Sequence, residues 1–551
     1  MRAQEKKKGK KKGKRKENQT LAEKLEGMAV TALDDIICVY LIMLLVVFPF
    51  YNEEGYSHIG TDKGTFFCKV FSMAGILAAV PLLICLGRRL SELKKNGGLS
   101  TSVRKAVSAG KVNFVDLFAL FYGAALLLSY IFAIDHEEAL WGTRGWFMGF
   151  LPHLSLIVTY FLVSRFWKPR KWLFCLILPV SAAVFFMACV NRFGYYPFGM
   201  ESAGHSFIST IGNINWYCGY AVSVTFAGVA LFWLGREWKT WQKVFLTAYT
   251  VLGYLSLLLQ GSDSGILALA VVLLSMFCLS VQDSDRMLAF WQQMALLWGS
   301  CLAIRLLVLL TPLEMTFVGS GVAILLKTPF CVSMTVVSVL ALSLVWADKR
   351  KGRYRKKLFR VLAWTAAVGA AVGVLGVSLM VVVNTLRPGS LGALSEKPLF
   401  TFDAYWGSSR GATWSAGWRC FLAQNPLHKL VGVGPDCMWS YINSGSSPEL
   451  LADVQLRFGG SRLTNAHNEW LTILVDEGIL GLIGYGGMII CGIRELLGKA
   501  KGNPFVMACG LSLLAYTVNN IFSFQQAMSV GTIFVLFGMG KAFLREEEGV
   551  T

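Results

Sequence analysis

Apolar stretches about as long as a bilayer is thick recur along this chain. A helix needs roughly 20 apolar residues to cross the hydrocarbon core of a membrane. Only 15% of the 551 residues are charged, against about 25% in soluble domains. This excludes a water-exposed globular fold and predicts an all-α, polytopic transmembrane helix bundle with about fourteen spans, 12 to 14 being the range. The predicted spans are residues 28–50, 66–87, 113–134, 146–164, 172–190, 214–234, 244–260, 265–281, 288–310, 326–347, 358–384, 468–491, 504–524 and 527–544.

Basic residues orient these spans. The formal charge is +19, from 52 Lys+Arg against 33 Asp+Glu, and in a soluble protein such a surplus would suggest nucleic-acid binding. Residues 1–24 hold eleven of these basic residues and show no apolar periodicity. We expect a disordered cytoplasmic tail beside anionic headgroups rather than a nucleic-acid-binding arm. With this tail inside, 39 of the 52 basic residues lie in or at the ends of cytoplasmic segments, as the positive-inside rule requires.

The alternation of sides gives a plan for the whole chain. It predicts a transmembrane bundle over 25–384, a large extracytoplasmic loop with short helices over 385–467, C-terminal membrane helices over 468–545 and a cytoplasmic tail over 546–551. Both termini are then cytoplasmic. The thirteen cysteines have no spacing typical of metal ligands, and we expect no metal. Cys420 and Cys437 share the loop, and a disulfide between them stays open.

The large loop contains a predicted helix at about 409–424. Its apolar residues recur at helical spacing, and Asn425-Pro426 ends it. The stripe fits either a face packed on the bundle or a platform for stacking on sugars. The glycine-rich segment 432–435 that follows is better explained as a turn than as a phosphate-binding loop, since it lacks the Lys-Ser/Thr of such loops. The stripe consists of Trp414, Trp418, Phe421 and Leu422.

His467 lies where the large loop returns to the bilayer. Asn465 is a plausible N-cap, which places His467 in the first turn of the next helix. A helix N-terminus favours the neutral imidazole, the form that can accept a proton at pH 7. A surface histidine and a functional one are both compatible with this position. Asp476 and Glu477, further along the same helix, are intramembrane acids, which are usually paired or functional.

Few arginines fall on the outer side, and these are candidates for binding an anion. Arginine stays charged at low dielectric and recognises phosphate with two parallel hydrogen bonds. Arg410 precedes Trp414 by one helical turn, so both can face the bundle. Each of these arginines can instead extend toward lipid headgroups. The outward arginines are Arg144, Arg192, Arg387, Arg410, Arg419, Arg457 and Arg462.

Several motifs in this order resemble the O-antigen ligase and O-antigen polymerase superfamily of bacterial membrane glycan transferases. The resemblance covers roughly residues 115–545. The main motif is His467-Asn468-Glu469-Trp470-Leu471, continuing through Glu477-Gly478-Ile479-Leu480-Gly481. Upstream matches are Arg410 with Trp414 and Trp418, Pro426-Leu427, Gly432-Val433-Gly434-Pro435, Gly212-Asn213-Ile214-Asn215 and Trp141-Gly142-Thr143-Arg144-Gly145. Many members have Ser-Arg-Gly where this chain has Gly261-Ser262-Asp263-Ser264-Gly265, so the arginine commonly assigned to donor phosphate is missing there.

The resemblance implies an enzyme in the cytoplasmic membrane of a bacterium. It would transfer a glycan from an undecaprenyl-pyrophosphate carrier to a hydroxyl of a glycan, glycolipid or wall-polymer acceptor, with inversion and without metal or other cofactor. His467 is the expected general base, and Arg410 is the expected catalytic partner that binds pyrophosphate. Expected substrate-binding residues are Arg144, Arg192, Asn213, Asn215, Trp414, Asn468 and Glu477.

Other functions remain open at this point. A repeat-unit polymerase shares the chemistry of a ligase and differs only in its acceptor. A flippase for lipid-linked oligosaccharides also suits fourteen spans, although transporters usually place polar residues at the bilayer midplane. We expect membrane lipids as partners and no nucleic acid, and the sequence leaves the oligomeric state undetermined.

Overall fold

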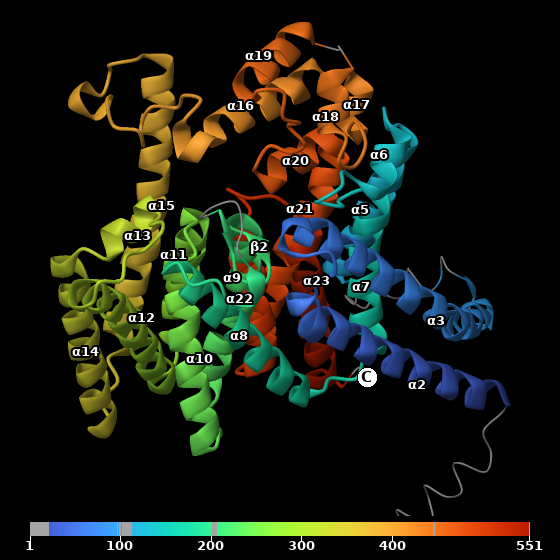
Figure 1. Ribbon diagram of the computed structural model, residues 1–551. Helices are drawn as coiled ribbons and strands as arrows, with labels where there is room; N and C mark the ends of the chain where they lie inside the picture. The colour runs from blue at the N-terminus through green and yellow to red at the C-terminus, as the bar shows by residue number, and fades with distance from the viewer. Residues whose placement is uncertain are drawn as a thin grey trace, which may run out of the picture.

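The computed structural model describes residues 21–95, 97–98, 101, 113–200, 206–444 and 447–549. Over these residues the protein is a bundle of long helices with a group of short helices at one end (Figure 1). The two described strands, β1 (Phe207–Ile208) and β2 (Gly212–Asn213), form one short antiparallel pair. The predicted all-α bundle is confirmed. Residues 1–20 of the predicted basic tail lie outside the described residues, and α2 begins at Leu21.

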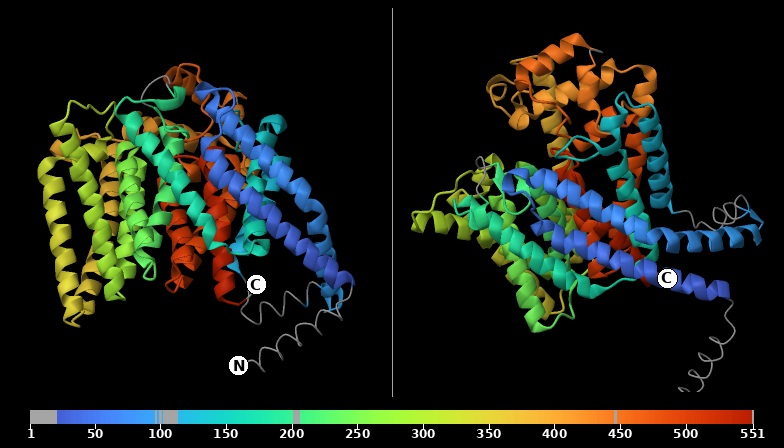
Figure 2. Two further views of the ribbon diagram at one scale, coloured as in Figure 1. Left: turned by 60° about the horizontal axis from the view of Figure 1, so that its bottom comes forward. Right: turned by 45° about the vertical axis from the view of Figure 1, so that its right-hand side comes forward.

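Twelve helices in the described part of the chain are long and apolar enough to cross a membrane. They run side by side through the bundle (Figure 2). Two shorter apolar helices, α7 (Phe150–Phe166) and α22 (Pro504–Asn519), bring the number to the fourteen predicted segments. The twelve are α2 (Leu21–Ile42), α3 (Ile59–Lys95), α5 (Phe114–Ile131), α8 (Phe174–Arg192), α9 (Ile214–Leu234), α10 (Thr240–Leu259), α11 (Asp263–Ser280), α12 (Ser284–Leu310), α14 (Thr328–Arg350), α15 (Lys356–Leu386), α21 (Gly478–Lys499) and α23 (Ala527–Glu547).

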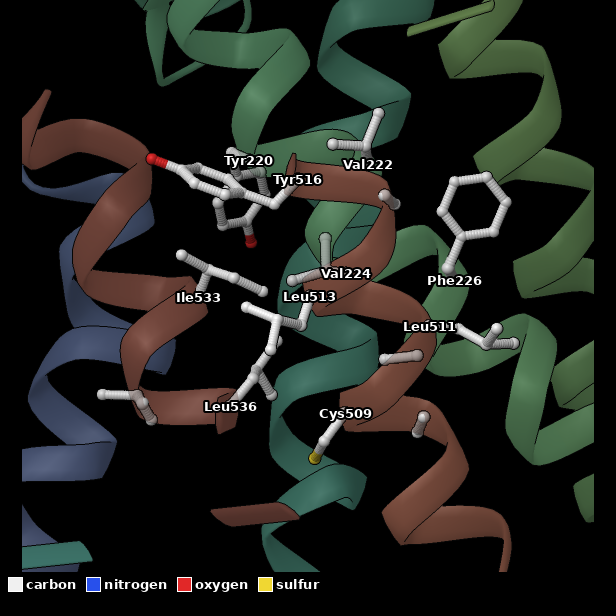
Figure 3. Packing of buried hydrophobic residues seen from close by; sticks show 14 of the residues in the cluster. Tyr220, Val222, Val224, Phe226, Cys509, Leu511, Leu513, Tyr516, Ile533 and Leu536 are labelled. Atoms are coloured by element: carbon white, nitrogen blue, oxygen red, sulfur yellow. The ribbon is translucent and has the colours of Figure 1, made fainter. Parts of the chain in front are cut away.

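The centre of the bundle is formed by α9, α22 and α23. These helices are apolar on all sides, a pattern that belongs either in a core or in a membrane, and nearly all their residues are buried. Their side chains interlock in Figure 3, where Tyr220 and Val224 of α9 face Leu513 and Tyr516 of α22. By contrast, α14 and α15 expose most of their apolar side chains. We therefore place α9, α22 and α23 inside the bundle and α14 and α15 at its lipid-facing edge.

Short helices follow α15 and gather at the top of Figure 1, beyond the end of the bundle. They share a small apolar core that includes Cys420, Val433, Met438 and Val475. Cys420 and Cys437 are both buried free thiols in this core. The predicted loop helix is confirmed and runs from Trp406 to Ala423. The helices at this end are α16 (Trp406–Ala423), α17 (Pro426–Val431), α18 (Met438–Asn443), α19 (Pro448–Phe458) and α20 (Glu469–Asp476), with α6 (His136–Trp141) beside them.

The segment predicted as one helix over 468–491 is two helices, α20 and α21, broken at Gly478. Gly478 has a φ of 71°, and a Cβ there would lie 2.5 Å from the amide nitrogen of Gly432. The glycine-rich turn docks at this break, where the Gly434 N–H donates to the Asp476 carbonyl at 2.9 Å. The prediction of one continuous helix was wrong, because the turn occupies the space that a continuous helix would need.

The remaining elements are short connections. The chain between α2 and α3 forms one π-helical and two 3-10 turns, and α13 lies between α12 and α14. These elements are η1 (Met43–Val47), η2 (Phe48–Phe50), η3 (Tyr56–His58), η4 (Lys171–Leu173), η5 (Pro197–Gly199), α13 (Ser320–Leu325) and η6 (Gly392–Leu394).

Candidate active site

His467 directly precedes the N-cap of α20. The N-cap is Asn468, whose side-chain oxygen accepts from the Leu471 N–H. The prediction that Asn465 caps this helix was wrong. Asn465 instead accepts the backbone N–H of His467 at 3.0 Å, and this turn holds His467 at a φ of 49°. Left-handed backbone is uncommon outside glycine and often occurs at functional positions. The turn therefore fixes the direction in which the His467 side chain leaves the backbone.

The His467 ring is partly buried and packs against Phe524. The two ring centroids are 4.8 Å apart and the planes lie at 80°. Burial lowers the pKa of His467 to about 4, and the positive charge of Arg410 acts in the same direction. The imidazole is therefore neutral near pH 7, as predicted. The causes differ from the predicted one, since burial and Arg410 lower the pKa and the helix N-terminus is not among them.

Arg410 is held on α16 by two backbone carbonyls. Its Nε donates to the Phe522 carbonyl at 2.6 Å, and its Nη1 donates to the Gly407 carbonyl at 2.9 Å. Burial lowers its pKa, while Cys218 and Asp263 act to raise it. A guanidinium stays charged even so, which leaves a fixed cation beside a neutral histidine.

Trp414 lies one turn after Arg410 and shares its face, as predicted. Its ring stacks on Phe522 with centroids 5.4 Å apart and planes at 27°, and it also contacts Trp406. Its indole N–H is buried without a hydrogen-bond partner among the described residues. Of the predicted stripe, Trp418 and Leu422 are about half exposed, so only part of it packs on the bundle.

The segment between α22 and α23, residues 520–526, was missed by the sequence analysis. We call it the α22–α23 link. Its Phe522 accepts from Arg410 and stacks on Trp414, and its Phe524 contacts His467. The available signal was the pair Asn519-Asn520 and the pair Gln525-Gln526, which interrupt two apolar helices. The link therefore brings the last two helices of the chain into the site.

Arg192 is buried at the end of α8 and serves the backbone of a neighbouring helix. Its Nε and Nη2 donate to the carbonyls of Leu259 and Gln260, at 2.6 and 2.8 Å. Its guanidinium also lies 5.6 Å from the centroid of the Phe317 ring. Arginine in this role satisfies the carbonyls that a helix leaves unpaired at its C-terminus. Two of its donor atoms are thus already engaged within the protein.

Arg144 is exposed, on a loop that a buried carboxyl holds in place. Asp436, another residue missed by the sequence analysis, accepts the Thr143 N–H at 2.7 Å. Burial raises the pKa of Asp436 to about 7. A Cβ at Gly142 would lie 2.7 Å from the Asp436 carboxylate. The glycine of the Trp-Gly-Thr-Arg motif therefore allows this loop to pack against Asp436.

Asn213 and Asn215 lie where β2 meets α9, the start of a middle span, as predicted. The Asn213 side chain caps α9 by accepting the Asn215 N–H at 2.9 Å. The two residues are partly buried. Elsewhere at this end, Arg419 and Arg457 both pair with Asp453 within the loop.

Glu477 is buried below the loop. Tyr122 donates to its Oε1 at 3.2 Å, and the His153 Nε2 lies 3.4 Å from the same oxygen. Its other oxygen has no hydrogen-bond partner among the described residues. Glu477 also borders a cavity of about 30 Å³, room for a water molecule. The cavity is lined by Trp146, Met148, His153, Asp436, Asn465, Glu469, Thr472, Ile473, Asp476, Glu477, Phe524 and Gln525.

Comparison with known protein families gives a match over part of the chain. Residues 315–486 match the O-antigen ligase family. The matched segment contains Arg410, Trp414, His467, Asn468 and Glu477, while the predicted site residues before residue 315 lie outside it. A search of curated proteins found no match. The family match confirms the resemblance to the O-antigen ligase and polymerase superfamily over this segment, and the twelve apolar helices in the described part of the chain indicate a multi-pass membrane protein.

Proposed function

We propose that this protein transfers a glycan from an undecaprenyl-pyrophosphate carrier to an acceptor hydroxyl, acting as a ligase. The family match supports a membrane glycosyltransferase of the O-antigen ligase or polymerase type, with a lipid-linked donor and a glycan acceptor. The observation that carries the more specific proposal is the pairing of a neutral His467 with the fixed charge of Arg410.

The membrane orientation is part of the same proposal. Most basic residues of the sequence fall in segments that alternate with the large loop across the predicted spans, and the positive-inside rule then puts this loop outside a bacterial cytoplasmic membrane. Both termini are then cytoplasmic. A site at the outer end of the bundle suits a donor that arrives sideways through the bilayer.

The reaction is a direct displacement. A ring nitrogen of His467 takes the proton of the acceptor hydroxyl as its oxygen attacks the anomeric carbon. The bond from that carbon to the pyrophosphate oxygen breaks, and the sugar is inverted. Arg410 stabilises the negative charge on the departing pyrophosphate, the kind of fixed electrostatic stabilisation that enzymes favour. General base catalysis typically contributes 10²–10⁴-fold.

Other residues have supporting roles in this proposal. Arg144, which is exposed, adds a second cation for pyrophosphate, whereas Arg192 is engaged with the carbonyls of Leu259 and Gln260 and has a structural role. The unpaired indole N–H of Trp414 supports a hydrogen bond to substrate. Asn213, Asn215 and Asn468 supply amides for sugar or phosphate, and Glu477 supports the site from below.

Reconstitution of the full chain with a carrier-linked glycan tests the proposal. We expect release of undecaprenyl pyrophosphate and a single transfer to a foreign acceptor. A ladder of products with carrier still attached would identify a polymerase instead. His467→Ala should abolish transfer in a folded, inserted protein, and near-normal activity in that variant would contradict the assignment. Translocation of the donor without a new glycosidic bond would identify a flippase.

A further inference from the structure

Glu469 lies two residues after His467 and is 2% exposed. The proposed reaction gives it no role, yet its carboxylate receives three side-chain hydrogen bonds. Tyr485 and Gln525 donate to its Oε1, and Asn520 donates to its Oε2. Its backbone N–H also donates to the Asn520 carbonyl at 3.0 Å. A buried carboxylate needs hydrogen-bond partners of this kind. The positions of these partners in the chain indicate that the contacts also hold another segment in place.

Two of these partners are at opposite ends of the α22–α23 link. Asn520 is its first residue and Gln525 is its last but one, so one carboxylate joins both ends of the link. Between them lie Phe522 and Phe524. These are the residues that contact Arg410 and His467, through the 2.6 Å hydrogen bond from Nε and the ring contact at 4.8 Å.

Apart from Glu469, the link is held by a contact of 2.6 Å between His153 Nε2 and the side-chain oxygen of Gln525 and by the packing of Phe524 on Trp146. Link residues 520–526 leave α22 and enter α23 without forming a helix. Hydrogen bonds to a carboxylate are stronger than those between neutral groups. Reacting groups also have to be held closely, since a 1 Å displacement can cost about 10²-fold in rate.

From these contacts we infer that Glu469 is a positioning residue, which clamps the α22–α23 link so that Phe522 holds Arg410 and Phe524 holds His467. The inference rests on the proposed function for its kinetic consequence. Its structural consequence, the placement of the His467 ring, can be measured without any transfer reaction.

The two oxygens of Glu469 permit a matched exchange. Glu469→Gln keeps one oxygen for Tyr485 and Gln525 but places an NH₂ against the NH₂ of Asn520. Asn520→Asp then supplies an acceptor for that NH₂, and it keeps the oxygen that accepts from Asn519 at 2.8 Å. The double variant therefore restores the pairing with donor and acceptor exchanged. Gln525→Leu detaches the other end of the link without altering the carboxylate, and it also removes the oxygen that lies 2.6 Å from His153 Nε2.

Four full-length variants in proteoliposomes test the inference, with kcat, the KM for donor and the rate at which diethyl pyrocarbonate modifies His467 as readouts. We expect Glu469→Gln to lower kcat by about 10²-fold and to speed modification of His467. Gln525→Leu should change both in the same direction by less, and the double variant should recover much of both. Asp34→Asn is the control, because Asp34 is an equally buried carboxylate on α2, paired with Arg170 in the connection between α7 and η4. It should change neither kcat nor the rate at which His467 is modified.

A folded Glu469→Gln protein with normal kcat and normal His467 modification would overturn the inference. So would a folded double variant that is no better than Glu469→Gln alone. If Glu469→Gln does not fold, Gln525→Leu decides, and normal values there would also overturn it. Activity in His467→Ala would instead contradict the proposed function, and the modification rates would still test the clamp.

Discussion

Arg410 lies close enough to His467 for its charge to help keep the imidazole neutral. The two residues come from α16 and from the turn before α20, and the α22–α23 link contacts both. A cation beside a base usually weakens that base. Here the same cation is available for the departing pyrophosphate, so one charge serves both proposed functions of the site.

The first prediction concerns the protonation of His467. Diethyl pyrocarbonate reacts with neutral imidazole, so its rate at His467 should stay level from pH 8 down to about pH 5 and fall only toward the pKa of about 4. Arg410→Met removes a charge that disfavours protonation, so the pKa should rise and the rate should begin to fall at higher pH. Arg410→Lys keeps the charge and serves as the control. Identical profiles for wild type and Arg410→Met would contradict the electrostatic coupling.

The second prediction concerns Asp436 and stability. Its pKa is about 7 in the folded protein against 3.8 for the free group, so the unfolded chain loses this proton first as the pH rises. Asp436 should therefore cost about 1.4 kcal/mol of stability per pH unit between roughly pH 4 and pH 7. Asp436→Asn can still accept from Thr143 and should lack this decline. Thermal unfolding at pH 4.5 and pH 7 measures the difference, and parallel curves for the two proteins would count against it.

The third prediction concerns the break between α20 and α21. Gly478→Ala forces a Cβ into left-handed backbone and against the backbone of residues 430 and 432. We expect this contact to lower the free energy of unfolding by about 2 kcal/mol or more, in addition to the roughly 1–2 kcal/mol that the left-handed conformation costs a residue with a Cβ. Transfer should be lost as well. Gly498→Ala is the matched control, because nothing lies within 4 Å of its added Cβ and alanine favours a helix. Equal melting temperatures for the two variants would show that the turn does not set the break.

The fourth prediction separates stability from binding at Arg192. Arg192→Ala leaves the buried carbonyls of Leu259 and Gln260 without these donors, at about 1–3 kcal/mol for each unsatisfied group. The melting temperature should fall clearly, while the KM for donor should change little in the protein that remains folded. Arg144→Ala should show the reverse, a raised KM with normal stability. A large KM effect at Arg192 with unchanged melting would assign it to pyrophosphate instead.

The sequence predicted the bundle well because membrane spans are specified by length and hydropathy. Each of the fourteen apolar segments corresponds to a helix or, at 468–491, to a broken pair. The break itself was not predictable, since it depends on a glycine turn more than forty residues upstream. Asn425 was predicted correctly as the stop of α16 because Asn-Pro acts locally.

The site was predictable only in part. His467 and Arg410 stood out by motif and by their position on the loop side. The side chains of Glu469 and Asp436 contact residues that are distant in the sequence, and no local sequence pattern indicates such contacts. The structural roles of both residues were therefore missed. Arg192 showed the opposite problem, because its residue type suggested a ligand site while the carbonyls that engage it lie 67 and 68 residues away.

The position of the α22–α23 link has a consequence for biosynthesis. His467 and Arg410 emerge from the ribosome before residues 520–526, which follow them in the chain. A nascent protein that ends after α21 therefore carries the proposed base and cation but lacks the residues that hold them. On the proposed function, transfer requires the insertion of the last two helices, so we expect a partly synthesised chain to be inactive toward the proposed lipid-linked donor.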